Sequence, residues 1–461
     1  MRRFAEELAG RRVAVLGFSR SGRAAAELLL LVGASVVIIE REASSVDETE
    51  RERLADRGVR FQLGDHHGGQ LEGIDYLVVS PGVPPTALPL VAATAAGIPV
   101  MGEMELSTRL AVGRLLAVTG TNGKSTTVSL LAEMLSSAGQ DAVALGNLGT
   151  PLSRRLVEGE RRDAVHCLEV SSFQAETLSS VRLDGVIQLN ITPDHLDRHG
   201  DLDSYAEAKL RLLDLQDGNG IAVLGADDAR LRAAAERAQG HVFWFGFGEL
   251  PGPGLRLVDD VVVSTLDDEE TEVFRASSLW SSGRGDLADA MAAATLAMAS
   301  GVAPKTIRRA LDGFIGLPHR RRVLPLGTTG PCFIDDSKAT NVAAAVASIS
   351  GSPEGVVVIL GGRHAGGDLT PVIDALAERD GRAVLLGRDR PQFEETIGER
   401  LPWDGATTLP EAVTLAAEAA GAEGTVLLAP ACASLDMFTN FEERGRVFEQ
   451  AARDYLADAS A

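Results

Sequence analysis

The sequence predicts an α/β protein with three domains, and three observations support this fold class. Short apolar runs alternate with helical patterns along almost the whole chain, which is typical of parallel sheets covered on both faces. The length of 461 residues suffices for about three domains. A glycine-bracketed turn at residues 120–123 joins an apolar run to a helix, as in domains that bind nucleoside phosphates. We expect a Rossmann-like domain at 1–102, a central P-loop ATPase-type domain with a parallel sheet at 103–316 and a Rossmann-like domain at 317–461.

Composition narrows the classes of function. The formal net charge of −21 argues against a nucleic-acid-binding surface, which needs a basic stripe. The three cysteines, Cys167, Cys332 and Cys432, are too far apart for a metal site or a disulfide framework, which is typical of a reducing compartment. The most apolar stretch, residues 28–39, is too short to cross a bilayer. We therefore expect a cytoplasmic protein that binds neither nucleic acid nor membrane.

The first predicted strand, Val13–Leu16, leads through a glycine-containing turn into a helix and a second strand that ends at Glu40. This is the order of a dinucleotide-binding unit, with Glu40 where a ribose-binding acid belongs. Ser19 replaces the middle glycine of the G-x-G-x-x-G fingerprint, which disfavours a nicotinamide cofactor. A further strand at 76–79 ends in the turn 80–85, at the sheet edge where ligands bind.

The phosphate loop at residues 120–126 opens the central domain. Backbone N–H groups and the dipole of the following helix can bind an anion there, Lys124 adds a point charge, and a hydroxyl can hold magnesium. The loop is shorter than the common pattern G-x-x-x-x-G-K-[ST], because Val118 stands where the first glycine belongs. Gly120 must therefore make the turn.

Polar residues follow the next two predicted strands. Glu169 ends the strand that begins at Val165, and a carboxylate beside a phosphate loop is expected to hold magnesium. His195 follows a strand predicted at 186–191, so we expect it in the same site. Lys209 lies among alanines in a predicted helix, and its surroundings alone favour an ordinary solvated lysine.

The remaining elements repeat this alternation. A strand is predicted at 221–224, short β segments at 251–282, alanine-rich helices at 285–300 and 304–311, and a basic linker at 313–322. In the last domain we expect strands at 333–334, 356–360, 383–386 and 426–429.

These motifs, in this order, make the chain similar to the Mur ligases over nearly its whole length. The short loop at 120–126 matches that superfamily, which accounts for the missing first glycine. Further signatures are Leu168–Gln174, Asn190–Asp197, Gly316–Arg320, Asp336–Asn341, Pro430–Asp436 and Asn440–Glu442. The last three resemble the branch of the family that adds glutamate.

The resemblance implies an ATP-dependent amide ligase of peptidoglycan precursor synthesis, with UDP-N-acetylmuramoyl-L-alanine and D-glutamate as substrates. A carboxylate is a poor electrophile, so ATP would first convert the alanine carboxylate into an acyl phosphate. The amine of D-glutamate would then attack, and phosphate would leave. Phosphoryl transfer between anions requires charge neutralisation and alignment, for which two magnesium ions are expected. We also expect a monomer.

The resemblance further implies roles for single residues. Lys124, Glu169, His195 and Lys209 would be catalytic, and Ser125, Glu169, His195 and Lys209 would hold magnesium, with Lys209 carbamylated and thus an anion that magnesium accepts. The expected ATP-binding residues are Gly120, Thr121, Asn122, Gly123, Lys124, Ser125, Thr126, Asp289, Arg320 and Asp336. Ser21, Glu40, Gly82 and Asn147 are expected near the UDP-sugar, and Lys338, Thr340, Ser434 and Phe441 in the glutamate pocket.

Two departures from the family pattern concern the ends of the ligands. Asp286 and Asp289 stand where relatives carry asparagines near adenine, and an ionised aspartate can only accept hydrogen bonds. Ala365 stands where many relatives carry a basic residue for the glutamate carboxylate, a role that Arg363 or His364 could take.

Three alternative functions stay open on the sequence. Another Mur ligase or a folate polyglutamate synthase would differ in the amino acid and acceptor used. A nicotinamide-dependent oxidoreductase would bind its cofactor in the first domain, although the interrupted G-x-G-x-x-G fingerprint there disfavours this. A nucleotide-binding regulator without turnover would fit the departures at Asp286, Asp289 and Ala365, although Lys124, Glu169, His195 and Lys209 are all present.

Overall fold

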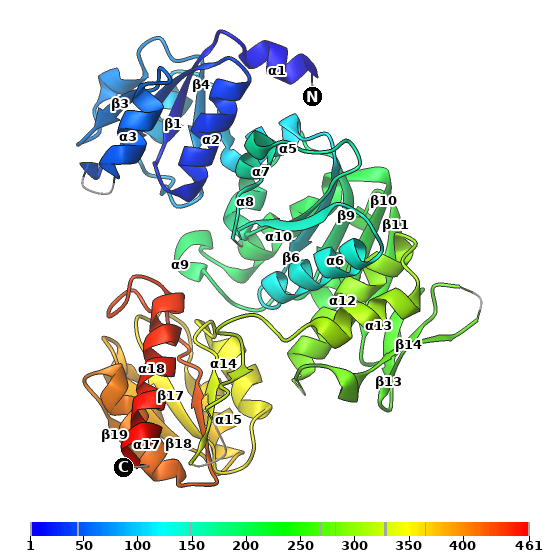
Figure 1. Ribbon diagram of the computed structural model, residues 1–461, viewed down its shortest axis with the longest axis vertical. Coiled ribbons are helices and arrows are strands. Elements are labelled where there is room, and N and C mark those ends of the chain that lie inside the picture. The colour runs from blue at the N-terminus through cyan, green and yellow to red at the C-terminus, as the bar shows by residue number, and fades with distance from the viewer. Residues whose placement is uncertain are drawn as a thin grey trace.

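The computed structural model describes residues 2–43, 46–147, 149–267, 269–281, 283–326, 330–364 and 366–459. The chain forms three sheets in sequence order, of five, nine and six strands, and Figure 1 shows them as three bodies. Most strand pairs are parallel, so the predicted three-domain α/β class is confirmed. The domain boundaries at 102 and 316 stay predictions.

The N-terminal sheet is parallel throughout, in the order β3-β2-β1-β4-β5. Its strands are β1 (Arg12–Leu16), β2 (Ser35–Glu40), β3 (Arg60–Leu63), β4 (Tyr76–Val79) and β5 (Val100–Gly102), and its helices are α1 (Arg2–Leu8), α2 (Arg20–Leu31), α3 (Glu48–Ala55) and α4 (Leu88–Ala95). Because the strand order reverses between β1 and β4, their carboxyl ends border a crevice of the kind that binds ligands.

The central sheet has the order β14-β13-β12-β11-β10-β9-β6-β8-β7. Its strands are β6 (Arg114–Thr119), β7 (Ala142–Gly146), β8 (Val165–Glu169), β9 (Leu183–Gln188), β10 (Gln216–Gly225), β11 (His241–Gly246), β12 (Gly254–Val258), β13 (Val261–Ser264) and β14 (Thr271–Arg275). The helices are α5 (Glu103–Leu110), α6 (Lys124–Ser137), α7 (Leu152–Glu158), α8 (Ser172–Thr177), α9 (Leu196–His199), α10 (Leu202–Asp214), α11 (Ala229–Ala233), α12 (Arg284–Ala299) and α13 (Pro304–Gly313). β12 to β14 pair antiparallel at one edge, where the sequence predicts short β segments.

The C-terminal sheet has the order β15-β16-β20-β17-β18-β19, with one antiparallel pair at its β15 edge. The strands are β15 (Arg322–Val323), β16 (Cys332–Asp335), β17 (Val357–Gly361), β18 (Arg382–Leu386), β19 (Trp403–Gly405) and β20 (Thr425–Leu428). The helices are α14 (Val342–Ser350), α15 (Thr370–Ala377), α16 (Arg390–Ile397), α17 (Leu409–Ala420) and α18 (Phe441–Ala459).

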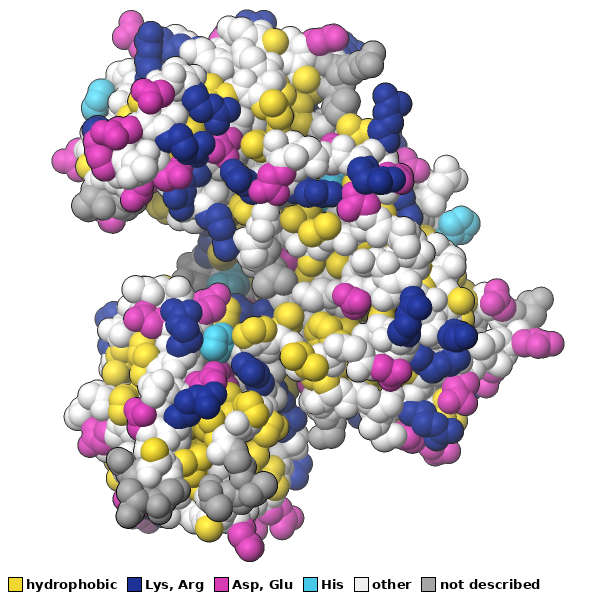
Figure 2. Space-filling model, in the orientation of Figure 1, with side chains coloured by type: hydrophobic (Ala, Val, Ile, Leu, Met, Phe, Trp, Pro, Cys, Tyr) yellow, Lys and Arg dark blue, Asp and Glu magenta, His cyan; other side chains and the backbone are white. Residues whose placement is uncertain are grey.

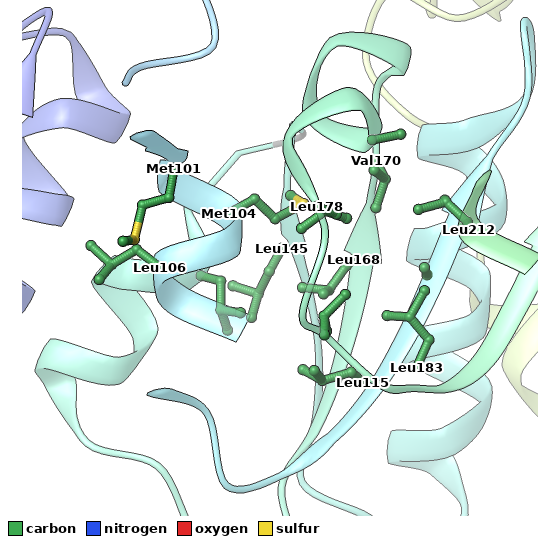
Figure 3. Close-up of a cluster of buried hydrophobic side chains, with 14 of the residues drawn as sticks. Met101, Met104, Leu106, Leu115, Leu145, Leu168, Val170, Leu178, Leu183 and Leu212 are labelled. Atoms are coloured by element: carbon green, nitrogen blue, oxygen red, sulfur yellow. The ribbon is translucent and has the colours of Figure 1, made fainter. Parts of the chain in front are cut away.

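One continuous cluster of buried apolar side chains joins the N-terminal and central domains. Met101 and Met104, on β5 and α5, belong to the same cluster as side chains of the central sheet. Figure 3 shows Met101 beside Leu106 and Met104 beside Leu178. Each such side chain contributes about 2 kcal/mol when fully buried. Among the described residues, the C-terminal domain packs around two clusters of its own. The first two domains therefore share a core, whereas the third does not.

The carboxyl ends of three central strands determine where the candidate site lies. β9, β6 and β8 are neighbours and parallel, so their carboxyl ends lie along one edge. The phosphate loop follows β6, and Glu169 ends β8. Among the described residues, no helix is both long enough and apolar enough to cross a bilayer.

Candidate active site

A cavity of about 520 Å³ lies where the three domains meet. Figure 2 shows a notch between the N-terminal and C-terminal domains, with basic side chains on both rims. Predicted site residues that line the cavity are Gly82, Thr121, Asn122, Lys124, Ser125, Thr126, Asn147, Glu169, His195, Lys209, Asp289, Arg320, Asp336, Lys338 and Thr340. In a protein of net charge −21, five lysine and arginine side chains line this cavity, as an anionic ligand requires.

The phosphate loop that the sequence predicts forms a tight turn between β6 and α6. Gly123 has a φ of 86°, and a Cβ there would lie 2.0 Å from Oδ1 of Asp289, so this position requires glycine. α6 begins at Lys124, and its N-terminal N–H groups face the loop. Lys124 Nζ donates to the carbonyls of Gly120 at 2.9 Å and Thr121 at 2.7 Å. The lysine is thus folded over the loop.

The segment that follows β9 forms hydrogen bonds to this loop. The N–H of Asn122 donates to Oδ1 of Asn190 at 2.9 Å, and Nδ2 of Asn190 donates to the carbonyl of Asn122 at 3.2 Å. The N–H of Ile191 donates instead to Asp228 at 2.7 Å. β9 therefore ends at Gln188, and the predicted strand over 186–191 is three residues too long.

Glu169 is 3% exposed and held by two donors. Nδ2 of Asn147 donates at 2.7 Å, and Oγ of Ser125 donates to the other oxygen. Burial pushes the pKa of Glu169 upward, but the charge of Lys124 and these hydrogen bonds outweigh it and hold the pKa below its usual value. Glu169 is thus an anion beside a hydroxyl.

Glu169 and Ser125 form an oxygen donor set that suits magnesium, which binds through one or two carboxylates together with substrate phosphates. Among the described residues, no three His, Cys, Asp or Glu side chains cluster as a complete metal cage. The site therefore fits an ion shared with the nucleotide.

His195 lies seven residues beyond β9, at the start of α9, and is thus further from the strand than the sequence predicts, because β9 ends early. Its φ is 52°, and its side chain is 49% exposed. The ring packs against Phe173, with centroids 5.1 Å apart. Phe173 also stacks on His199, whose Nε2 lies 3.0 Å from Oγ of Ser172. A loop with this aromatic support positions His195 at the cavity.

Lys209 is 1% exposed, so its interpretation as a solvated helix lysine is wrong. Nζ donates to the carbonyl of Gly120 at 2.8 Å and lies 4.6 Å from the ring centroid of Tyr205. Burial and the charge of Lys124 lower the pKa of Lys209 well below its usual value. A lysine with a lowered pKa is more often neutral, and the neutral amine is the form that reacts with carbon dioxide.

Lysine scarcity is a signal that sequence reasoning missed. The chain contains 4 lysines among 44 basic residues, and three of them, Lys124, Lys209 and Lys338, line this cavity. The fourth, Lys305, is exposed on α13. Arginine and lysine differ in chemistry, because only lysine is a compact charge that deprotonates readily. The lysines of this chain are thus concentrated at the cavity.

The predicted glutamate pocket lies partly outside the cavity. Lys338 and Thr340 line it, and Nζ of Lys338 lies 4.4 Å from the ring centroid of Phe441. Ser434 is 3% exposed and does not line the cavity, nor does Phe441. Ala365 lies outside the described residues.

Arg444, which the sequence did not reveal, connects these segments. It is 3% exposed, and its guanidinium donates to Oγ of Ser337 at 3.0 Å, to the Ser337 carbonyl at 2.7 Å and to the Cys432 carbonyl at 3.1 Å. Oγ of Ser337 donates to the Phe441 carbonyl at 2.8 Å. Burial lowers the pKa of Arg444 to about 10. The arginine thus ties the segments that precede Lys338, Ser434 and α18.

We expect Arg444→Lys to raise the KM for glutamate about tenfold or more while the KM for ATP stays within about twofold, because the donors of lysine all lie on one nitrogen and cannot replace the three guanidinium nitrogens that bind Ser337 and Cys432. Steady-state kinetics with each substrate varied measure this. Arg446→Lys, two residues along α18, is the control. Equal changes in both KM values would contradict the assignment.

The predicted UDP-sugar residues divide between two cavities. Glu40 and Gly82 line a cavity of about 740 Å³ in the N-terminal domain, where Glu40 accepts the N–H of Phe18 at 2.8 Å. Gly82 lines this and the central cavity, whereas Asn147 lines only the central one. Ser21, on α2, lines neither of them. A long ligand could pass over Gly82 from one cavity to the other.

The aspartates at the predicted adenine end differ from their sequence-based interpretation. Burial, together with the neighbouring Asp286, raises the pKa of Asp289 well above its usual value. Burial also raises the pKa of Asp286. A protonated carboxyl group can both donate and accept, as an asparagine amide does. The raised pKa values shift both carboxyl groups toward this protonated form.

Comparisons with known proteins place this geometry in a class. The description "Mur ligase middle domain" matches residues 118–286, and "Mur ligase MurD-like, N-terminal domain" matches residues 11–102. The fold is similar to that of UDP-N-acetylmuramate–alanine ligase MurC from Thermotoga maritima (TM-score 0.61, 17% identity, 98% of this chain and 100% of that chain). It is also similar to that of MurF ligase from the same organism in complex with ADP (TM-score 0.57, 16% identity, 99% and 97%).

A phosphate loop, a buried carboxylate and three α/β domains around one cavity define the class of ATP-dependent ligases. The chain is 40% identical to UDP-N-acetylmuramoylalanine–D-glutamate ligase of Thermobifida fusca over 97% of this chain and 99% of that protein. It is 35% identical to the enzyme of the same name from Koribacter versatilis, over 97% and 98%. The chain belongs to the Mur ligase family.

Proposed function

We propose that the protein is an ATP-dependent ligase that joins D-glutamate to UDP-N-acetylmuramoyl-L-alanine through an acyl phosphate. The convergence of Lys124, Glu169 and Lys209 with Lys338 of the C-terminal domain on one cavity carries this proposal. The name shared by relatives that match nearly the whole chain supports the same substrates. The reaction belongs to peptidoglycan precursor synthesis in the cytoplasm, and the enzyme acts as a monomer.

The residues of this chain account for the phosphoryl step. Lys124 leaves its two loop carbonyls and pairs with the β- and γ-phosphates, while the loop N–H groups hold them. Ser125 and Glu169 would hold one magnesium ion, and His195 with carbamylated Lys209 a second. Such ions, when bound, supply the positive charge that lets a carboxylate approach the γ-phosphate.

The acceptor end depends on the C-terminal domain. Lys338, backed by the ring of Phe441, presents a cation at the cavity for a glutamate carboxylate. The amine can then attack the acyl carbon, and the tetrahedral intermediate expels phosphate. Because the alanine carboxylate must reach the γ-phosphate, the UDP-sugar runs from the Glu40 cavity over Gly82.

Phosphate release by the purified protein with ATP and magnesium tests the proposal. Release is expected only when both UDP-N-acetylmuramoyl-L-alanine and D-glutamate are present. A panel of amino acids, including L-glutamate, and of acceptors including folates separates other ligases of this class. Release without any amino-acid dependence, or none with any pair, would refute the proposed reaction.

The pH dependence of glutamate use is expected to reflect Lys338. Burial and the charge of Arg320 lower the pKa of Lys338 to about 8. The cation is present below this pH and is lost as pH rises through 8, so wild-type kcat/KM for glutamate should bend downward there. Deprotonation of the glutamate amine acts in the opposite direction, so the reference is Lys338→Arg, which stays charged. Identical profiles for the two proteins would contradict the role of Lys338.

A further inference from the structure

Asn341, at the start of α14, extends from the C-terminal domain to the central domain. Its Nδ2 lies 3.0 Å from Oδ2 of Asp194 and 3.4 Å from Oδ1 of Asn122. Among the described residues, these are the hydrogen bonds that join residues 317–461 to the rest of the chain. Asn122 belongs to the phosphate loop, and Asp194 directly precedes His195.

The oxygen of the Asn341 side-chain amide forms a hydrogen bond within the C-terminal domain. Oδ1 of Asn341 accepts the N–H of Ala344 at 2.8 Å and thereby caps α14. The cap orients the side chain so that Nδ2 points to the central domain. The partner, Asp194, has a side chain only 13% exposed, so a hydrogen bond to its carboxylate is sheltered from water. The side chain of Asn341 thus forms hydrogen bonds to residues of both domains.

The contacts of Asn341 link two domains that do not share a hydrophobic core. The N-terminal and central domains share a buried core, whereas the C-terminal domain packs around its own clusters and is joined through residues 313–322. A movement of the C-terminal domain would separate Asn341 from both acceptors. It would also remove Thr340 and Lys338 from the cavity, because they lie one and three residues before Asn341.

We propose that Asn341 is a positioning residue that couples closure of the C-terminal domain to the phosphate loop and to the segment carrying His195. The inference deepens the proposed ligase function and rests on it. When the domain is closed, one amide holds both Asn122 and Asp194. The acyl phosphate is then formed and met by the amine in the same closed arrangement.

Two variants separate this role from helix capping. Asn341→Asp keeps an equally good cap but cannot donate to Asp194, and Asn341→Ser keeps a cap but is too short to reach across. We expect kcat/KM for glutamate to fall about tenfold to hundredfold in both, the loss that corresponds to one hydrogen bond to a charged group. The Tm should stay within about 2 °C of wild type. Asn341→Ala, which loses the cap as well, should also lower the Tm.

Small-angle scattering provides a readout that capping would not change. With ATP and the UDP-sugar but no glutamate, the radius of gyration of wild type should decrease, and that of Asn341→Asp and Asn341→Ser should decrease less. The inference is overturned if both variants close and turn over as wild type does, or if only Asn341→Ala is impaired. Scattering does not depend on glutamate chemistry, so wild-type protein that closes without forming the amide would refute the proposed reaction and leave the coupling intact.

Discussion

Lys209→Ala is expected to lower kcat about a thousandfold or more, the scale for removing a preorganised charge from a reacting phosphoryl group. Lys209 is fully buried against the Gly120 carbonyl and the Tyr205 ring, where alanine leaves both charge and volume unreplaced. If the working form is a carbamate, Lys209→Glu should restore part of the activity. Formate or acetate added to Lys209→Ala should do the same, because a short carboxylate can occupy the vacated space. Steady-state phosphate release measures each protein.

The control for this series is Lys305→Ala, which removes the one lysine that does not line the cavity. Its activity should equal that of wild type. Full activity in Lys209→Ala would eliminate the carbamate. A large loss that carboxylates do not rescue would instead favour a role for Lys209 as a cation. Depleting and restoring carbon dioxide in the wild-type assay gives an independent comparison, because carbamylation is reversible.

Glu169→Gln is expected to lower kcat about a hundredfold and to raise the magnesium concentration needed for half-maximal activity about tenfold or more. The substitution keeps the shape, and its amide oxygen can still accept from Asn147 or Ser125, but the negative charge opposite Lys124 is lost. A magnesium titration of phosphate release measures both effects.

The matched control is Glu160→Gln, near the opposite end of β8. Oε2 of Glu160 lies 2.7 Å from Nε2 of His166. Burial raises the pKa of Glu160, but hydrogen bonds, chiefly the one to His166, outweigh burial and lower the pKa below its usual value. Its loss should alter stability without changing the magnesium requirement. If Glu169→Gln needed no more magnesium than wild type, Glu169 would have a structural role only.

Local pattern was enough for the phosphate loop and the sheet around it. Gly120 and Gly123 lie between a strand and a helix whose periodicities are visible in the chain, Lys124 is the first residue of that helix, and Glu169 ends β8 where expected. Such features depend on neighbours in sequence, so backbone conformation and hydrogen-bond direction follow from residue type. The early end of β9 shows the limit, because Asn190 leaves the strand for a partner 68 residues away.

The sequence by itself thus determined the three-domain α/β class and the glycine turn between β6 and α6, and through its resemblance to a family it predicted site residues, most of which line the central cavity. Only the tertiary structure decided which of them are buried together. Lys209 is a polar helix residue by pattern and a buried amine by packing, and Asp289 owes its raised pKa to burial beside Asp286. Arg444 and Asn341 form hydrogen bonds to residues far away in the sequence, which a local sequence pattern cannot predict. Burial and pKa depend on what surrounds a group in space, and those surroundings form only when the chain has folded.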